Sequence, residues 1–288
     1  MKNKKLSHNG LQGSVTSVMA ALLCILIGLF VGFLVLLAIN PAHAWADGFV
    51  RILKGGFHDA PYGVGKELAN AAPLIMTGLS VGFAFKTGLF NIGAAGQYTL
   101  GAYGALYCAI MLKLPWFVCL LAAAILGGLW GAIPGFFKAY FNINEVITSI
   151  MFNWIGLYLV NELVYQNGTG PMYDVRNTRT LNLGKNADLA QSVIPDFGLN
   201  KLFQTNSTTI AIFLAAVVAI LIWVVLNKTT FGYELKAVGL NKSAARYAGI
   251  NEKKNIILSM AIAGALAGFG AGLFYLSNVG QWNPLNST

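Results

Sequence analysis

Long apolar runs, broken by short polar segments, dominate the 288-residue chain. A helix needs about 20 apolar residues to cross the hydrocarbon core of a bilayer, which is roughly 30 Å thick. The pattern predicts an all-α, polytopic transmembrane helical bundle with about seven spans. The runs are Val18–Ile39, Leu68–Phe85, Leu89–Leu112, Trp116–Phe137, Val146–Val164, Thr208–Leu226 and Ile256–Leu276.

The second and third runs are separated by only three residues, Lys86, Thr87 and Gly88. Either both runs cross the membrane, or one of them is a broken or re-entrant helix. Irregular backbone at membrane depth is tolerated only where protein or a water-filled cavity surrounds it. The sequence leaves both alternatives open.

The first run has the flanks of a secretory signal peptide, with lysines before it and Ala42-His43-Ala44 after it. The apolar part of such a peptide usually has 7–15 residues, whereas this run has 22. We therefore interpret it as an uncleaved first span. Residues 1–17 are then a cytoplasmic tail, and residues 18–288 form a single transmembrane domain.

Charges between the runs predict the orientation. We assume a cytoplasmic N-terminus and one crossing per run. The inside segments then hold 11 Lys and Arg residues and three acidic residues, whereas the outside segments hold eight Lys and Arg residues and seven acidic residues. Lys and Arg are normally in excess on the cytoplasmic side. This orientation makes residues 165–207 an external loop and residues 227–255 a basic cytoplasmic loop.

Composition excludes several other classes of protein. The chain is 56% hydrophobic and 10% charged, whereas soluble domains carry about 25% charged residues. Its net charge of +9 is spread between the runs rather than along one stripe, so we expect no nucleic-acid partner. Cys24, Cys108 and Cys119 lie inside apolar runs without pairing spacing, which argues against a metal site or a disulfide. The sequence has no phosphate-binding loop, so we expect no cofactor in this chain.

The basic segment 227–255 contains a predicted short helix. Asn241 is a favourable N-cap, Lys242–Ala248 has high helix propensity, and Gly249 is a natural stop. A helix of about two turns between two crossings is narrow enough to enter a groove on a partner protein. The alternative is a solvated loop whose charges only set the topology.

This segment resembles the cytoplasmic coupling loop of ABC-importer permeases of the branched-chain amino acid, ribose and nucleoside branch. The resemblance implies that the short helix contacts a cytoplasmic ATPase. The positions that match the family pattern are Gly239, Asn241, Ala244, Ala245, Gly249 and Ile250.

A second match covers residues 88–105, whose Phe90-Asn91-Ile92-Gly93 and Gly96-Gln97 pieces look like those of nucleoside and simple-sugar permeases. The glycines allow close helix approach or a break in the helix. Asn91 and Gln97 are uncharged hydrogen-bonding groups within an apolar run. They either satisfy neighbouring helices or line the substrate pathway.

A third match, residues 144–153, is similar to the Asn-Glu-Val-Ile segment of the family. Glu145, Ser149 and Asn153 recur every four residues, so they share one helix face. Such a polar stripe must face protein or water rather than lipid. Glu145 either stabilises the helix N-terminus or lines the pathway, and we assign Ser149 and Asn153 to the pathway.

Small residues recur every four positions in the last run, at Gly264, Gly268 and Gly272. This spacing predicts close helix packing, within one chain or across a dimer. The pairs Gly131/Gly135 and Gly28/Gly32 have the same spacing.

The resemblance implies a permease subunit of an ATP-driven importer in a bacterial plasma membrane. Its expected partners are a second permease in a heterodimer, a cytoplasmic ABC ATPase that holds the ATP, and an extracytoplasmic substrate-binding lipoprotein. Nucleosides are the first choice of substrate, then ribose-like sugars, then branched-chain amino acids. Family members usually continue for a few crossings beyond the point where this sequence stops, which leaves open whether it is a fragment.

An ion-coupled secondary transporter of a small polar solute is the alternative. Such proteins often hold ionisable groups at membrane depth, but Glu145 and Glu162 lie near the ends of their run. Asn and Gln can still build sodium sites, so this alternative remains. No nucleophile, base and electrophile-stabilising group share a spacing in the sequence, so we do not expect an enzyme.

Overall fold

The computed structural model describes residues 3–284, with side chains from residue 18 onward. The chain forms two compact units, residues 1–63 and 64–288. In the first unit, α1 (Asn3–Ile39) contains the whole first apolar run. The short turns that follow are α2 (Pro41–His43), the π-helical η1 (Ala44–Phe49), α3 (Val50–Lys54) and the 3-10 turn η2 (Gly55–Phe57). Phe33 of α1 packs against Trp45 and Phe49, with ring centroids 5.7 and 4.9 Å apart.

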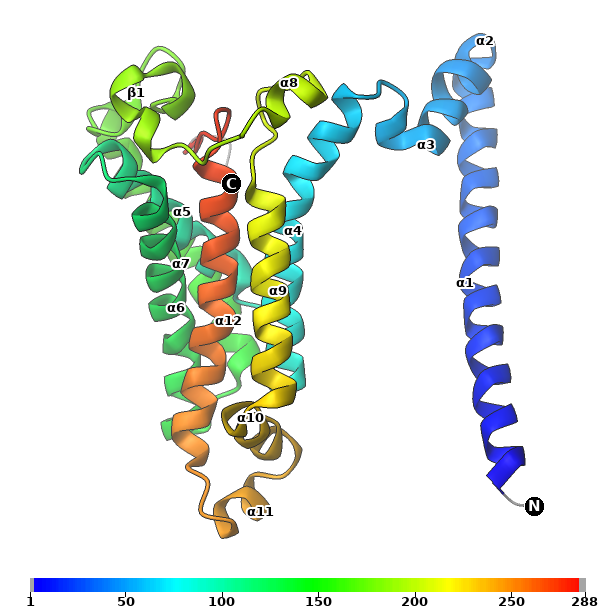
Figure 1. The fold of residues 1–288 in the computed structure, drawn as a ribbon, viewed down its shortest axis with the longest axis vertical. Helices are drawn as coiled ribbons and strands as arrows, with labels where there is room; N and C mark the ends of the chain where they lie inside the picture. Colours follow the sequence, from blue (N-terminus) through cyan, green and yellow to red (C-terminus); the bar gives the residue numbers. More distant parts are fainter. Residues whose placement is uncertain (1–2, 285–288) are drawn as a thin grey trace. The chain divides into compact units, whose positions relative to one another are not determined.

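Six long helices build the second unit (Figure 1), and α12 has the largest number of buried residues among them. Because α12 contacts both α5 and α6 along its length, its small residues are covered by protein rather than by lipid. The helices are α4 (Tyr62–Lys86), α5 (Ala94–Ile110), α6 (Trp116–Phe141), α7 (Glu145–Tyr165), α9 (Ala211–Lys228) and α12 (Glu252–Tyr275).

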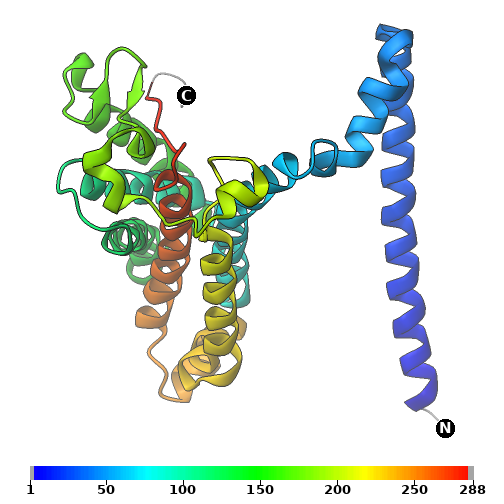
Figure 2. The same ribbon diagram turned by 45° about the horizontal axis from the view of Figure 1, so that its top comes forward.

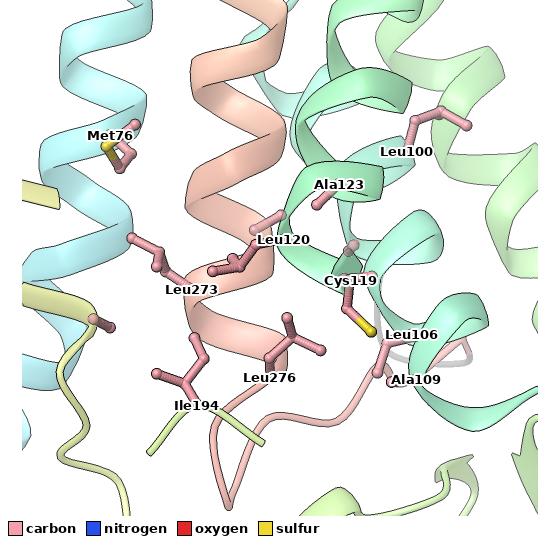
Figure 3. Close-up of a cluster of buried hydrophobic side chains, with 14 of the residues drawn as sticks. Met76, Leu100, Leu106, Ala109, Cys119, Leu120, Ala123, Ile194, Leu273 and Leu276 are labelled. Atoms are coloured by element: carbon pink, nitrogen blue, oxygen red, sulfur yellow. The ribbon is translucent and has the colours of Figure 1, made fainter. Parts of the chain in front are cut away.

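The apolar core of this unit lies where α12 meets its neighbours. Figure 3 shows Leu273 of α12 and Leu276, just after this helix, together with Leu120 and Ala123 of α6, and all four side chains are buried. Ile194, from the connection between α7 and α9, joins the same cluster and is also buried. The core therefore includes part of a connecting loop as well as the helices.

Glycines bring the backbones of α6 and α12 into direct contact. A Cβ atom on Gly264 would lie 2.3 Å from the carbonyl oxygen of Gly127, and one on Gly268 would lie 2.3 Å from that of Ala123. On Gly272 it would lie 2.8 Å from Leu120 Cδ2. The small-residue stripe of the last apolar run is thus used within one chain.

The third apolar run does not form one continuous helix. Residues 87–93 are not helical, and the helix resumes only at Ala94. Leu89, Asn91 and Gly93 are buried, whereas Phe90 and Ile92 are exposed, so one side of the irregular backbone is covered by protein, as irregular backbone at membrane depth requires. Within residues 3–284, six helices are long and apolar enough to cross a membrane. At 17 residues α5 is shorter than these six, because the first part of its run is irregular.

The connections between the helices alternate between two ends of the second unit. Ser192 Oγ, in the α7–α9 connection, donates to Leu114 O, in the α5–α6 connection, at 2.6 Å. At the other end, Lys253 of α12 lies over Tyr140 of α6, with the ammonium 4.6 Å from the ring centroid. Residues 165–207 and 227–255 therefore lie at opposite ends.

The α7–α9 connection is a folded structure (Figure 2). Its elements are η3 (Gln166–Gly168), β1 (Tyr173–Asp174), β2 (Arg179–Thr180), η4 (Leu183–Lys185), η5 (Ala187–Ser192) and α8 (Leu199–Phe203), with β1 and β2 antiparallel. Thr180 N donates to Trp282 O at 2.9 Å, and Trp282 N donates to Thr180 Oγ1 at 3.0 Å. The amide of Asn177 donates to Asp174 and lowers the pKa of that carboxyl below its usual range.

Candidate functional site

Three buried polar side chains meet beside the irregular segment that precedes α5. Asn91 Nδ2 donates to Gln97 Oε1 at 2.8 Å, and Gln97 Nε2 donates back to Asn91 Oδ1 at 2.9 Å. Asn91 Nδ2 also donates to Ser80 Oγ of α4 at 3.0 Å, and Ser80 Oγ donates to Ala263 O of α12 at 2.6 Å. We call Ser80, Asn91 and Gln97 the amide cluster. It joins α4, α5 and α12 through uncharged groups alone.

Asn153 of α7 caps the N-terminus of α5, whose own N-cap residue has no side chain. The N-cap residue of α5 is Gly93, which has no side chain to accept from the first free N–H groups of the helix. Gly96 N donates instead to Asn153 Oδ1 at 2.8 Å, and Asn153 Nδ2 donates to Ile92 O at 2.9 Å. One side chain from a neighbouring helix therefore holds the backbone on both sides of Gly93.

Ser149, one turn before Asn153, is fully buried, and its hydroxyl has no hydrogen-bond partner among the described residues. It lies close to the amide cluster. A Cβ atom on Gly93 would lie 3.1 Å from Gln97 Nε2, 3.2 Å from Ser149 Oγ and 3.3 Å from Asn91 Oδ1. The four residues predicted to line the pathway are thus gathered around one glycine, and Ser149 keeps unused hydrogen-bonding capacity.

Glu145, the remaining member of the polar stripe on α7, forms an ion pair instead. Its carboxylate lies 2.7 Å from Lys138 Nζ. Asn144 caps this helix, because its side chain accepts from Val146 N at 2.9 Å. Glu145 thus lies in the first turn of α7, where an acid is favoured by the helix dipole, and is paired with a cation that the sequence did not predict.

The turn after α4 touches the short helix α10 (Thr230–Leu240) backbone to backbone. Gly88 has a φ of +74°, and a Cβ atom on it would lie 2.4 Å from Gly239 Cα. A Cβ atom on Gly239 would lie 2.5 Å from Thr87 C. Thr87 Oγ1 and Ser259 Oγ also share a hydrogen bond, which joins the same turn to α12. Gly239 therefore faces its own bundle.

The predicted short helix is α11 (Lys242–Tyr247). Asn241 Oδ1 accepts from Ala244 N at 3.0 Å, and Gly249 has a φ of +80° just after the helix. Ala245 is buried in a small apolar cluster, and Ile250 packs against the same cluster. The residues of the family pattern thus form the N-cap of α11, the stop after it and its buried face.

The outer face of this segment carries two large residues that the sequence analysis missed, Leu240 and Tyr247, beside the predicted Ala244. The exposed fraction is 89% for Leu240 and 94% for Tyr247, and Ala244 is exposed as well. We call Leu240, Ala244 and Tyr247 the outer face. Leu240 and Tyr247 are large side chains next to polar residues of the loop. This contrast was the signal in the sequence that could have identified them.

Comparison with known families decides what kind of protein carries these features. Residues 65–287 match the family described as branched-chain amino acid transport system / permease component. The chain belongs to this family of permeases. It is thus a transport subunit, a multi-pass protein of the plasma membrane, and ATP hydrolysis in this family lies on a separate subunit. Its relatives are named as permease proteins of ABC transporters, so other subunits of such a system are its partners.

Individual relatives of the permease are similar over most of its length. The guanosine ABC transporter permease protein NupP of Bacillus subtilis is 34% identical over 94% of this chain and 72% of its own. The nucleoside ABC transporter permease protein NupB of Lactococcus lactis is 32% identical over 91% and 72%. The glucose ABC transporter permease protein TsgB13 of Haloferax volcanii is 34% identical over 86% and 65%. No solved structure matches the permease.

Membership in this family favours ATP-driven import over the ion-coupled alternative. Among the residues the structure describes, no group of three His, Cys, Asp or Glu side chains is placed to hold a metal ion. The permease therefore offers two candidate sites, the uncharged groups around Gly93 and the outer face of α10 and α11.

Proposed function

We propose that the permease imports nucleosides and that α10 and α11 receive the cytoplasmic ATPase. A second permease completes the membrane part as a heterodimer, and a substrate-binding lipoprotein delivers the solute at the opposite end, where residues 165–207 lie. Gly239, Asn241, Ala245, Gly249 and Ile250 hold α11 in place, and Ala244 belongs to the contact surface.

The exposed outer face carries this proposal. Leu240 and Tyr247 are almost fully exposed, although Asn241, Lys242 and Arg246 place the same segment in water. The two side chains lie on either side of the exposed Ala244 in the sequence, and tyrosine is enriched at the centres of protein–protein contacts. Docking of a soluble subunit would cover both side chains.

Charge supports the orientation. The end of the second unit that carries α10 and α11 has eight basic and three acidic residues, as expected for the cytoplasmic side. They are Lys86, Lys138, Lys228, Lys236, Lys242, Arg246, Lys253 and Lys254, with Glu145, Glu234 and Glu252.

The chemistry around Gly93 supports an uncharged polar solute. Amide and hydroxyl groups both donate and accept hydrogen bonds, which suits the hydroxyls of a ribose and the edges of a base. The described side chains of this site include no charged pair for the zwitterion of an amino acid. Nucleosides come first because NupP and NupB carry guanosine and nucleoside in their names. Sugars come second, given TsgB13.

The test changes the outer face without changing the bundle. The double variant Leu240→Ala/Tyr247→Ala should fold and insert normally, because both side chains are exposed. Loss of two central anchors should weaken association with the ATPase at least about tenfold. Association is measured by co-purification, and uptake by labelled guanosine entering vesicles that contain ATP and carry the binding protein outside.

Leu202→Ala is the matched control, since Leu202 is an exposed leucine at the opposite end with an exposed fraction of 64%. It should leave ATPase association intact. Unchanged association and uptake in the double variant would reject docking on the outer face. Guanosine uptake driven by an ion gradient without any ATPase would reject the function itself.

A further inference from the structure

A groove between α4 and α9 lies at the same end of the unit as α10. Its volume is about 470 Å³. Leu79 and Phe83 of α4 face Ile222, Trp223 and Leu226 of α9 across it. From Leu79 to Lys86 the wall follows α4 for two turns, roughly 10 Å. The groove is therefore an apolar surface cleft that extends from the ends of α4 and α9 along their membrane-spanning parts.

Cationic groups stand at the mouth of this groove. Lys86, the last residue of α4, and Lys236 of α10 both line it, together with Asn227. Lys228, the last residue of α9, lies over the Trp223 ring with its ammonium 5.8 Å from the centroid. Of the described residues that line the groove, none is acidic.

The nearest acid on α10 is turned away from the groove. Glu234 accepts a hydrogen bond from Asn255 Nδ2 of α12 at 3.4 Å, and it is not among the residues that line the groove. The mouth is therefore positive, whereas the walls below it are apolar. A ligand that complements both parts has a negatively charged head and a hydrocarbon tail.

We propose that this groove binds an anionic phospholipid. The lipid phosphate lies between Lys86 and Lys236, and an acyl chain lies along Leu79, Ile222 and Leu226. Basic pockets between transmembrane helices at a membrane surface bind anionic headgroups in this way. Trp223 lies at the boundary, where indole rings prefer the headgroup level. A soluble phosphate compound would leave the apolar walls uncovered.

The experiment uses Trp223 as the reporter. The full permease is placed in vesicles of phosphatidylglycerol and phosphatidylcholine, with bromine on the acyl chains of one lipid at a time, because bromine quenches tryptophan fluorescence on contact. The difference between wild type and Trp223→Phe isolates the signal of this residue. Two lysines predict a preference for phosphatidylglycerol on the order of tenfold.

Two variants show whether the lysines cause the preference. Lys86→Gln/Lys236→Gln should lose most of the preference, because only Lys228 then remains at the mouth, whereas Lys253→Gln/Lys254→Gln, at the same end but outside the groove, should keep the preference. Three results would overturn the proposal. They are equal quenching in wild type, a preference that is undiminished in the Lys86/Lys236 variant, and no quenching of Trp223 by either lipid, which would mean that a protein helix fills the groove.

Discussion

Ser149 differs from the other polar side chains around Gly93 in one respect. Asn91, Gln97 and Asn153 each make at least two hydrogen bonds, whereas the Ser149 hydroxyl makes none among the described residues. A buried hydroxyl without a partner costs about 1–3 kcal/mol. A group kept at such a cost is a candidate for contact with a solute that passes through.

Ser149→Ala therefore separates folding from transport. Removing an unsatisfied hydroxyl should leave the free energy of unfolding unchanged or higher. Guanosine uptake should fall about tenfold, since one hydrogen bond to the solute is lost. Thermal unfolding in detergent and uptake in vesicles measure the two effects.

Ser259→Ala is the matched control for this change. Its buried hydroxyl is bonded to Thr87, so the variant should unfold more easily. Normal uptake by Ser149→Ala would remove Ser149 from the pathway.

Single residues were predictable where their role is local. Asn241 as a cap and Gly249 as a stop follow from a few neighbouring residues. The capping of α5 by Asn153 was not predictable, because its partners Ile92 and Gly96 are 61 and 57 positions away. The stripe on α7 showed only that Asn153 would face protein or water.

At the scale of the element, the contact between α6 and α12 depends on the absence of side chains. The carbonyl oxygens of Gly127 and Ala123 occupy the places where Cβ atoms of Gly264 and Gly268 would stand. Since these neighbours are backbone atoms, they cannot rotate away. A larger residue must separate the helices.

Gly268→Leu should therefore lower the free energy of unfolding by about 3 kcal/mol or more, at the upper end of the usual range for overpacking. Unfolding in detergent, followed by circular dichroism, measures the loss. Gly78→Leu is the control, because a Cβ atom on Gly78 of α4 would meet no atom within 4 Å. If both variants unfold alike, the close approach of α6 and α12 does not contribute to stability.

Helices were largely predictable from the apolar runs, because length and hydropathy alone define a crossing. The run Leu89–Leu112 is the exception. A broken helix and a continuous one have the same hydropathy, so the break at residues 87–93 depends on partners that surround it, including Ser80 and Asn153. These partners are distant in sequence.

For the whole molecule, the orientation in the membrane decides which end can meet an ATPase. We expect a membrane-impermeant maleimide to label Asn177→Cys in intact cells, and Asn251→Cys only after permeabilisation. Both positions are exposed. Asn177 lies between β1 and β2 and Asn251 between α11 and α12, at opposite ends of the second unit. The background is a variant without Cys24, Cys108 and Cys119. Labelling of Asn251→Cys in intact cells would place α11 outside and exclude the proposed docking.

The arrangement of the α7–α9 connection could not be predicted from the sequence. Composition indicated only a hydrophilic loop, whereas Thr180 pairs with Trp282, about a hundred residues later. Trp282 Nε1 also donates to Asn161 Oδ1 at 2.9 Å. Such long-range pairs give this end a defined surface.

The approach of Gly88 to Gly239 has a mechanical consequence. No side chain separates the two backbones. A displacement of α10 therefore cannot be absorbed by side chains that change rotamer. A push delivered to α10 and α11 must shift the residues that lead to Asn91, and with them the partners of Gly93. A displacement of the outer face would thus be transmitted directly to the polar groups around Gly93.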